Sequence, residues 1–338
     1  MFALSSRRMF LRFALLLLPL LIIPLLLIPA SAAPGDLTPA YFSAQTVIDA
    51  ALAPANMFGG LQVNCPAGMV ALSGGVDVNN VLNMVVTSSG PAYTNERLLF
   101  QDDGSALAPT GWQASVVNES TTARDFRVGV VCVDESAGLI SEIDSSTVPA
   151  GSFSVSYADC PEGTIAVGGG VDVGQVLLMR VSSLAPRFPG ANSRLFMRDN
   201  GVDVAPTGWQ ATAINDSVAN YQMKVAAICA PEHPAALTMI TSDTMSGGFG
   251  SARPVCPADM VAVGGGVDLE NVLTMDVSAS GMTFTGSTAR LYQQEDGVHG
   301  LPRGWHGSAR GPNGTTVRTG VICLPLYRSF LTMLVTPE

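Results

Sequence analysis

The chain has 338 residues, of which 47% are hydrophobic and 13% are charged, and its formal net charge is −10. An acidic chain lacks the basic surface that nucleic acids require, so we expect no nucleic-acid partner. The apolar content is well above that of a disordered chain, and abundant Gly, Val, Ala, Ser and Thr in short alternating segments indicates a β-rich extracellular protein.

The first 32 residues have the layout of a signal peptide. Basic residues between Arg7 and Arg12 precede an apolar stretch, 13–29, and three small residues that end at Ala32. A membrane anchor would need a helix that tolerates three prolines in that stretch, so we expect cleavage after Ala32 and no membrane span in the mature chain. Segment 6–12 resembles a twin-arginine export signal, whereas a general secretory signal fits the apolar stretch equally well. Either route predicts an exported protein, located outside the cell or on the surface of its envelope.

A threefold internal repeat covers nearly all of the mature chain. Each copy starts with a Cys-Pro pair and ends with a second cysteine, 67, 69 and 67 residues further on. We define repeat 1 as residues 33–135, repeat 2 as 136–232 and repeat 3 as 233–338. Recurrence at a nearly fixed period is typical of an array or of a closed pseudo-symmetric ring.

Six cysteines in an exported chain predict disulfide bonds. The simplest of the 15 pairings places one bridge in each repeat. These bridges are Cys65–Cys132, Cys160–Cys229 and Cys256–Cys323. Each would stabilise its unit by roughly 4 kcal/mol in the chain-entropy model. The close Cys-x-x-Cys pairs typical of zinc sites do not occur in the sequence.

The strands of each repeat can be predicted in chain order. Thr46-Val47-Ile48 opens repeat 1, and β-branched runs with a glycine-rich centre follow the first cysteines at 69–77, 164–172 and 260–268. Glycines within a strand predict a bulge or close backbone packing. A phosphate-binding loop is the rival interpretation, but no Lys-Ser/Thr pair and no helical pattern follow the glycines. Alternating segments at 81–86, 176–181 and 272–277 predict a second strand with one buried face.

An acidic turn follows in each repeat, at 102–104, 199–201 and 295–297. Asp-Gly and Asn-Gly pairs predict a hairpin, because their residues accept positive φ. The rival interpretation is a calcium site to which Asp77, Asp172 and Asp268 would add oxygen ligands. No complete calcium loop is present, so we expect a turn and an Asp–Arg pair within each repeat. We expect no other cofactor.

A Gly-Trp pair starts the last part of each repeat. The tryptophans are Trp112, Trp209 and Trp305. Exposed aromatic rings in β-modules stack on sugars, whereas a tryptophan between a glycine and a strand is typical of a core. The nearby sequons at Asn118, Asn215 and Asn313 are explained by turn chemistry without a glycan.

The end of the chain looks like the start of a fourth repeat. Segments 139–143 and 237–241 open repeats 2 and 3, and segment 330–335 reads Phe-Leu-Thr-Met-Leu-Val in the same style. Such an extra strand would cap an open sheet edge or complete another unit's sheet.

The pattern Cys-Pro-x-Gly, a glycine triplet, Gly-Trp and a late cysteine resembles modules of uncharacterised secreted bacterial proteins. Repeat 2 shows it most fully; repeat 1 has Ser73 in the triplet, and repeat 3 has Asp259 in place of the early glycine. The resemblance implies export and a modular character, and it carries no catalytic residues.

We therefore predict an all-β protein of three tandem sandwich-like or barrel-like repeats, with a closed pseudo-threefold arrangement as the alternative. The predicted function is a non-catalytic structural or binding role, with glycans or cell-envelope components as partners and the three tryptophans as binding residues. The alternative is a secreted hydrolase that uses carboxylate pairs or a bound cation. The histidines His233, His299 and His306 do not recur between repeats, and no G-x-S-x-G motif occurs.

Overall fold

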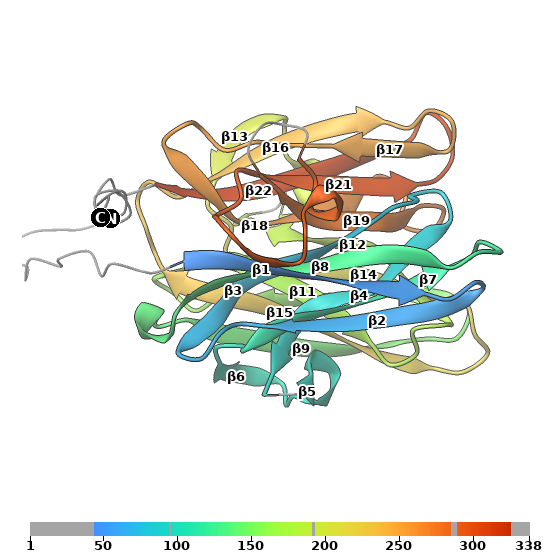
Figure 1. Cartoon of the computed structure of the whole chain (residues 1–338), viewed down its shortest axis with the longest axis horizontal. Coiled ribbons are helices and arrows are strands. Elements are labelled where there is room, and N and C mark those ends of the chain that lie inside the picture. Colours follow the sequence, from blue (N-terminus) through green and yellow to red (C-terminus); the bar gives the residue numbers. More distant parts are fainter. Residues whose placement is uncertain (1–43, 95, 191–192, 285–288, 326–338) are drawn as a thin grey trace, which may run out of the picture. The chain divides into compact units, whose positions relative to one another are not determined.

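The computed structural model describes residues 44–94, 96–190, 193–284 and 289–325, which belong to one unit, Tyr41–Glu338 (Figure 1). The signal peptide predicted for 1–32 and the strand predicted for 330–335 lie outside these residues. Strands and short 3-10 turns make up the regular structure of the described part, which confirms the all-β prediction. No helix among these residues is long and apolar enough to cross a membrane.

The repeats contain equivalent strands in the same order. Repeat 1 has β1 (Ala44–Ala53), β2 (Met57–Asn64), β3 (Met69–Val78), β4 (Met84–Tyr93), β5 (Glu96–Arg97), η1 (Leu98–Phe100), β6 (Gly104–Leu107), β7 (Gly111–Asn118), β8 (Arg124–Asp134) and η2 (Glu135–Ala137). Repeat 2 has β9 (Ile140–Val148), β10 (Ser152–Asp159), β11 (Thr164–Val173), β12 (Met179–Arg187), η3 (Leu195–Met197), β13 (Gly201–Val204), β14 (Gly208–Asn215) and β15 (Tyr221–Pro231). Repeat 3 has β16 (Leu237–Thr244), β17 (Phe249–Ala252), β18 (Met260–Leu269), β19 (Asp276–Thr283), η4 (Leu291–Gln293), β20 (Gly297–His299), β21 (Gly304–Arg310) and β22 (Thr316–Pro325).

Each of the three sheets takes strands from two repeats. The strand orders are β2-β7-β4-β11-β15-β9-β6, β10-β14-β12-β18-β22-β16-β13 and β17-β21-β19-β3-β8-β1-β20. Repeat 1 thus shares a sheet with repeat 2, repeat 2 with repeat 3, and repeat 3 with repeat 1. We call these three contacts joints, and the contact between repeats 3 and 1 the closing joint. The separate sandwiches expected for each repeat are not found, and the closed pseudo-threefold alternative describes the pairing.

The glycine triplets explain how three repeats can pack so closely. A Cβ on Gly168 would lie 2.4 Å from Leu72 O, and one on Gly264 would lie 2.1 Å from Val167 O, so the glycine strands of the repeats abut one another. The equivalent Ser73 closes this cycle, because its hydroxyl donates to Val263 O. Close backbone contact and a bulge at each strand were predicted from the glycines, and both are present.

The second and third glycines of each triplet meet other partners. A Cβ on the second glycine would overlap the tryptophan ring of the same repeat, and one on the third would meet a backbone carbonyl of the neighbouring repeat. The second glycines are Gly74, Gly169 and Gly265, and the third are Gly75, Gly170 and Gly266. Only a residue without a side chain fits at these positions.

The disulfide predictions are confirmed, and two details of the strand predictions need correction. Cys65–Cys132, Cys160–Cys229 and Cys256–Cys323 are bonded, one bridge per repeat. In all three repeats the second strand starts later than predicted, at Met84, Met179 and Asp276, because 81–83, 176–178 and 272–274 form turns. Gly104 has a positive φ of 106°, as the acidic turn requires, but β6 pairs with β9 of the next repeat, so the turn is not a hairpin.

Candidate functional site

The three predicted sugar-binding tryptophans are core residues. Trp112, Trp209 and Trp305 are each 0% exposed, and their rings cover the second glycines of the triplets. Trp112 Nε1 donates to Ser89 Oγ at 3.0 Å, and Trp305 Nε1 donates to Ser280 Oγ at the same distance. A ring with no exposed face cannot stack on a sugar, so the aromatic binding sites expected from the sequence are not formed.

Each joint is instead held by an arginine and a buried aspartate. Arg97, just before η1, donates from Nε to Asp172 Oδ2 at 3.1 Å and from Nη2 to Oδ1 at 2.5 Å. Leu99 N donates to Asp172 Oδ2 at 3.1 Å, and Gln113 Nε2 donates to the same oxygen at 2.8 Å. The equivalent pairs are Arg194–Asp268 and Arg290–Asp77. A carboxylate with these donors needs no cation to neutralise it.

These ion pairs join neighbouring repeats, whereas the sequence predicted them within one repeat. The reason lies in the sheet order: β4 is followed by β11 of repeat 2, so a segment that leaves β4 crosses the joint before β6 begins. We call the segments 97–100, 194–197 and 290–293 the clasps. Their leucines, at positions 98, 195 and 291, are 0% exposed. Leu291 packs against the glycines of β8 and β19 at the closing joint.

The aspartates predicted as metal ligands are therefore committed to the clasps. Asp77, Asp172 and Asp268 have 0% of their side chains exposed, and they lie at three separate joints. Burial raises the pKa of Asp77, but its contacts with His306 and Arg290 outweigh this effect and hold the pKa well below its usual value. No group of three or more metal-ligating side chains occurs within the described residues. Asp77, Asp172 and Asp268 are therefore not brought together into one site.

The acidic turns also bind across the joints. Lys224, the single lysine of the chain, is 3.1 Å from Asp103 of repeat 1, and Arg127 pairs with Asp296 of repeat 3. The hydroxyl of Ser145 donates to Asp103 at 2.6 Å, and this bond is the main cause that lowers the pKa of Asp103. The turns thus act as a second set of contacts between neighbouring repeats.

The closing joint contains a histidine where the other two have glutamine. His306 follows Trp305, as Gln113 and Gln210 follow their tryptophans, and it is 1% exposed. Its Nε2 is 3.3 Å from Ser251 Oγ, and its Nδ1 is 3.6 Å from Asp77 Oδ1. At 3.6 Å, the contact between His306 and Asp77 is slightly longer than a hydrogen bond and is mainly electrostatic.

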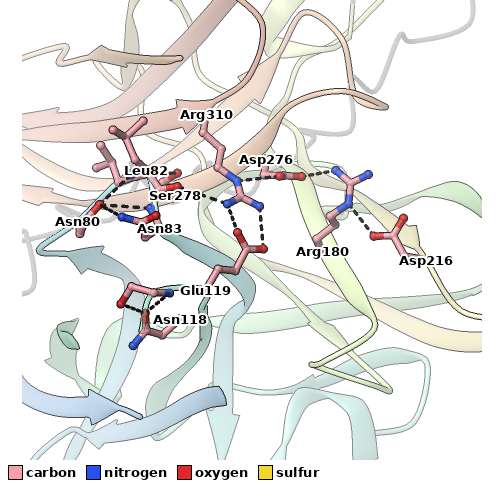
Figure 2. A network of polar contacts seen from close by, with 12 residues as sticks. Asn80, Leu82, Asn83, Asn118, Glu119, Arg180, Asp216, Asp276, Ser278 and Arg310 are labelled. Atoms are coloured by element: carbon pink, nitrogen blue, oxygen red, sulfur yellow. Dashed lines mark hydrogen bonds and ion pairs between the residues drawn. The ribbon is translucent and has the colours of Figure 1, made fainter. Parts of the chain in front are cut away.

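An ion-pair network spans all three repeats where β4, β12 and β19 begin (Figure 2). Arg310 Nε donates to Asp276 Oδ2 at 3.0 Å, and Arg310 Nη2 donates to Glu119 Oε1 at 3.0 Å. Asp276 also pairs with Arg180, whose Nε donates to Asp216 Oδ2 at 2.8 Å. Three acidic and two basic side chains therefore neutralise one another almost completely.

Exposed leucines and phenylalanines recur at equivalent positions of the repeats, and the carbonyls of Leu82 and Leu273 accept from Arg310 and Arg180 of this network. Three leucines precede β4, β12 and β19, and three phenylalanines lie at the starts of β2, β10 and β17. We call the six residues the apolar rim: Leu82, Leu177, Leu273, Phe58, Phe153 and Phe249. Their exposed fractions lie between 39% and 52%. Arg310 donates to Leu82 O and pairs in register with Phe249, so a leucine of one repeat lies beside the phenylalanine strand of another.

The asparagine side chains of the first two sequons make hydrogen bonds within turns. Asn118 is 0% exposed, and its Nδ2 donates to Ala53 O, Pro54 O and Thr122 O at 2.8 to 3.1 Å. Asn215 makes the equivalent bonds to Val148 O and Ala219 O. The turn interpretation accounts for both amides, whose nitrogens point into the fold.

Sequence reasoning missed the apolar rim, although its signal was present. The leucines of the Val-Leu-x-Met segments recur in all three repeats, but the predicted strand placed them in a buried alternation. The signal that separates rim from core is the asparagine at 80 and 271, whose side-chain oxygen accepts from the amide of the leucine two residues later and forms an Asx turn after the preceding strand.

No family model matches the chain, and no curated protein matches it either. Among solved structures, the chain is similar to the major capsid protein P2 from Bacteriophage PM2, with 7% identity over 57% of this chain and 99% of that chain and a TM-score of 0.25. It is also similar to a triple jelly roll structure from an archaeal virus, with 8% identity over 83% of this chain and 88% of that chain and a TM-score of 0.15. Similarities of this size carry no argument about what the chain does.

Proposed function

We propose that this protein is an exported, non-catalytic structural module that associates with a second copy of itself through the apolar rim. The observation that carries the proposal is the recurrence of an exposed leucine and an exposed phenylalanine in all three repeats. The recurring Asp–Arg pairs, by contrast, are committed to the joints. Large exposed apolar side chains that recur in every repeat are candidates for an interaction site.

The rim differs from the other exposed hydrophobic residues of the described part. On the edge strands β6 and β13, Leu107 and Val204 are exposed, but the equivalent residue of repeat 3 is Gly300. All three repeats therefore have apolar side chains at the rim positions, whereas only two of them have one at the position of Leu107, Val204 and Gly300. We attribute that recurrence to a contact that all three repeats make.

A second copy fits the rim better than a charged partner does. The network that Leu82 and Leu273 contact is nearly neutral, so two rims can face each other although the full sequence carries a formal net charge of −10. Because the rim repeats around a pseudo-threefold arrangement, a twofold axis would bring every leucine and phenylalanine onto an equivalent surface of the other copy. The glycan partner expected from the tryptophans has no such support, because their rings are buried.

The test is the oligomeric state of the mature protein, measured by light scattering over a wide concentration range. In the rim variant, Leu82, Leu177 and Leu273 are replaced by Glu. The matched control replaces three equally scattered exposed residues, Leu107, Val202 and Val298, by Glu on strands β6, β13 and β20. We expect the unaltered protein and the control to associate, and the rim variant to remain monomeric with an unchanged melting temperature.

Two results would contradict the proposal. The unaltered protein would be monomeric at all concentrations, or both variants would weaken association equally. Flotation with uncharged phosphatidylcholine vesicles distinguishes the remaining alternative: monomers that float only with an intact rim would show that it contacts lipid and not a second copy.

A further inference from the structure

The acidic turn of repeat 2 carries an amide where the other two turns carry a carboxylate. Asn200 stands at the position of Asp103 in repeat 1 and of Asp296 in repeat 3, and a glycine follows each of the three residues. Asp103 and Asp296 each pair with a cation of the neighbouring repeat, Lys224 and Arg127. A side-chain amide carries no charge, so the turn of repeat 2 does not make this ion pair.

The cation for such a pair is nevertheless present in repeat 3. Arg318 on β22 corresponds to Arg127 on β8 and to Lys224 on β15, because each lies opposite the buried clasp aspartate of its repeat in the strand register. Arg318 Nη1 donates to Phe196 O at 2.7 Å, as Arg127 Nε donates to Tyr292 O at 3.1 Å. Among the residues that the structure describes, Arg318 takes part in no ion pair, and its buried Nε has no hydrogen-bond partner.

A serine places the Asn200 side chain beside Arg318. Asn200 Nδ2 donates to Ser242 Oγ at 2.9 Å, and Ser242 lies opposite Arg318 where β16 pairs with β22. The joint between repeats 1 and 2 has the same arrangement: Ser145 Oγ donates to Asp103 at 2.6 Å and lies opposite the lysine that Asp103 binds. Opposite residues of an antiparallel pair have their Cβ atoms about 4.5 to 5.5 Å apart on one face of the sheet. A carboxylate at position 200 would therefore meet a cation, as the carboxylate of Asp103 does.

The sequence Asn200-Gly201 can produce this carboxylate without an enzyme. The backbone nitrogen of Gly201 attacks Cγ of Asn200, a new C–N bond closes a cyclic imide, and the side-chain nitrogen leaves as ammonia with the proton of the Gly201 amide. Water then breaks the bond between this nitrogen and Cγ, which restores the backbone and leaves aspartate. Glycine has no side chain to hinder the attack. Asn200 is exposed and lines an open polar hollow with Arg198 and Asp203, so water reaches the reacting atoms.

The other Asn-Gly pair of the sequence, Asn313-Gly314, provides an internal comparison. Gly314 N donates to Met245 O at 3.0 Å, and Asn313 Oδ1 accepts from Gly248 N at 3.0 Å. Both the attacking nitrogen and the side-chain carbonyl are thus held in place, and we expect this pair to react slowly. The side-chain bond of Asn200 to Ser242 is made by the nitrogen that leaves.

We propose that Asn200 is a self-modification site whose deamidation creates a third ion pair between an acidic turn and the neighbouring repeat. The chain as synthesised makes two such pairs, and the aspartate formed at position 200 binds Arg318 and completes the set. The modification acts after folding, because Arg318 lies beside this turn only once β16 has paired with β22. The joint between repeats 2 and 3 therefore becomes stronger as the protein ages.

Ageing of the mature protein at mildly alkaline pH, followed by peptide mapping with mass spectrometry, tests the chemistry. We expect Asn200 to convert several-fold faster than Asn313, with aspartate as the main product. The melting temperature should rise by about 1 to 3 °C as the conversion proceeds. Asn200→Gln keeps the amide but cyclises far more slowly, so this control should age without the rise. Equal conversion at positions 200 and 313, or no conversion at 200, overturns the assignment of the site.

The variant Asn200→Asp tests the ion pair separately from the chemistry. It should melt higher than the unaltered protein by the same shift as the aged protein, and the shift should disappear at high salt and in an Arg318→Gln background. Asp103→Asn makes the reverse change in repeat 1 and should lower the melting temperature. A shift that persists in Arg318→Gln overturns the pairing. So does an aged protein that carries mainly isoaspartate at position 200 and melts lower than fresh protein.

Discussion

The closing joint and the other two joints have the same kind of ion pair, but its partners are separated by a different length of chain. The clasps of repeats 1 and 2 reach aspartates 75 and 74 residues away, in the repeat that follows directly. The clasp of repeat 3 reaches back across 213 residues to Asp77. The chain connects the partners directly at two joints, whereas at the third only side-chain and strand contacts hold them.

The entropy cost of closing the longer loop is small compared with the cost of breaking a buried ion pair. Closing a loop of 213 residues instead of 75 costs about 1 kcal/mol more in chain entropy. Removing one partner of a buried ion pair costs about 3 to 5 kcal/mol. The extra closure entropy is therefore smaller than the penalty for leaving the buried Asp77 carboxylate without Arg290.

The largest expected effect is at the closing clasp. We predict that Arg290→Met lowers the free energy of unfolding by about 3 to 5 kcal/mol, because it leaves the fully buried carboxylate of Asp77 without its partner. Arg97→Met should cost less, since the Arg97 side chain is 36% exposed against 19% for Arg290 and water can approach more easily. Urea unfolding with the disulfides intact measures both.

A surface ion pair provides the control for this prediction. Arg187 and Asp159 have side chains that are 27% and 56% exposed, so Arg187→Met should cost no more than about 1 kcal/mol. If Arg290→Met costs as little as Arg187→Met, the clasps do not hold the ring closed.

An intermediate effect is expected where the glycine strands meet. Gly264→Ala places a Cβ 2.1 Å from Val167 O, and we predict a loss of about 1 to 3 kcal/mol from overpacking. Ser73→Gly at the equivalent position of repeat 1 removes one buried hydrogen bond, to Val263 O, and should cost about 1 kcal/mol. Equal tolerance of both changes in thermal unfolding would show that the repeats do not pack as tightly as the glycines indicate.

The strands, the bulges and the disulfides could be predicted from the sequence because they depend on local patterns within one repeat. The glycine triplets predicted close packing, but not that Gly168 meets Leu72 of another repeat. An internal repeat gives the same alternation whether a strand pairs within its own copy or with the next one. For this reason the sequence also assigned the Asp–Arg pairs to single repeats.

The candidate site was less predictable for the same reason. A tryptophan such as Trp112 is compatible with a core and with a binding surface. Its burial follows only from the position of Gly74 opposite its ring. Leu82 lies on the surface because it belongs to a turn, and the strand begins at Met84, three residues later than the alternation suggested. The burial of Trp112 depends on a long-range placement that a single sequence does not specify, whereas the turn at Leu82 has a local signal.

The smallest expected effect distinguishes the closing joint by pH. His306 faces Asp77, Arg290 and Arg253, and burial lowers its pKa below the ordinary value despite the nearby carboxylate. Unfolding restores the ordinary pKa of about 6.5, so between the two values the unfolded chain binds a proton that the folded chain does not. Stability from this group is therefore complete above about pH 6.5 and is lost as the pH falls below it.

We predict that His306→Gln, which gives the closing joint the residue of the other two, flattens the dependence of unfolding free energy on pH between about 7 and 5. The reciprocal variant Gln210→His should introduce the same loss of stability on acidification at a joint that lacks it, because Asp268 and Arg194 surround that position as Asp77 and Arg290 surround His306. Urea midpoints at half-unit pH steps measure both slopes. Asp77 does not confuse the result, since the stability from its lowered pKa is lost only as the pH falls below about 4. An unchanged slope in His306→Gln would place the acid sensitivity outside the closing joint.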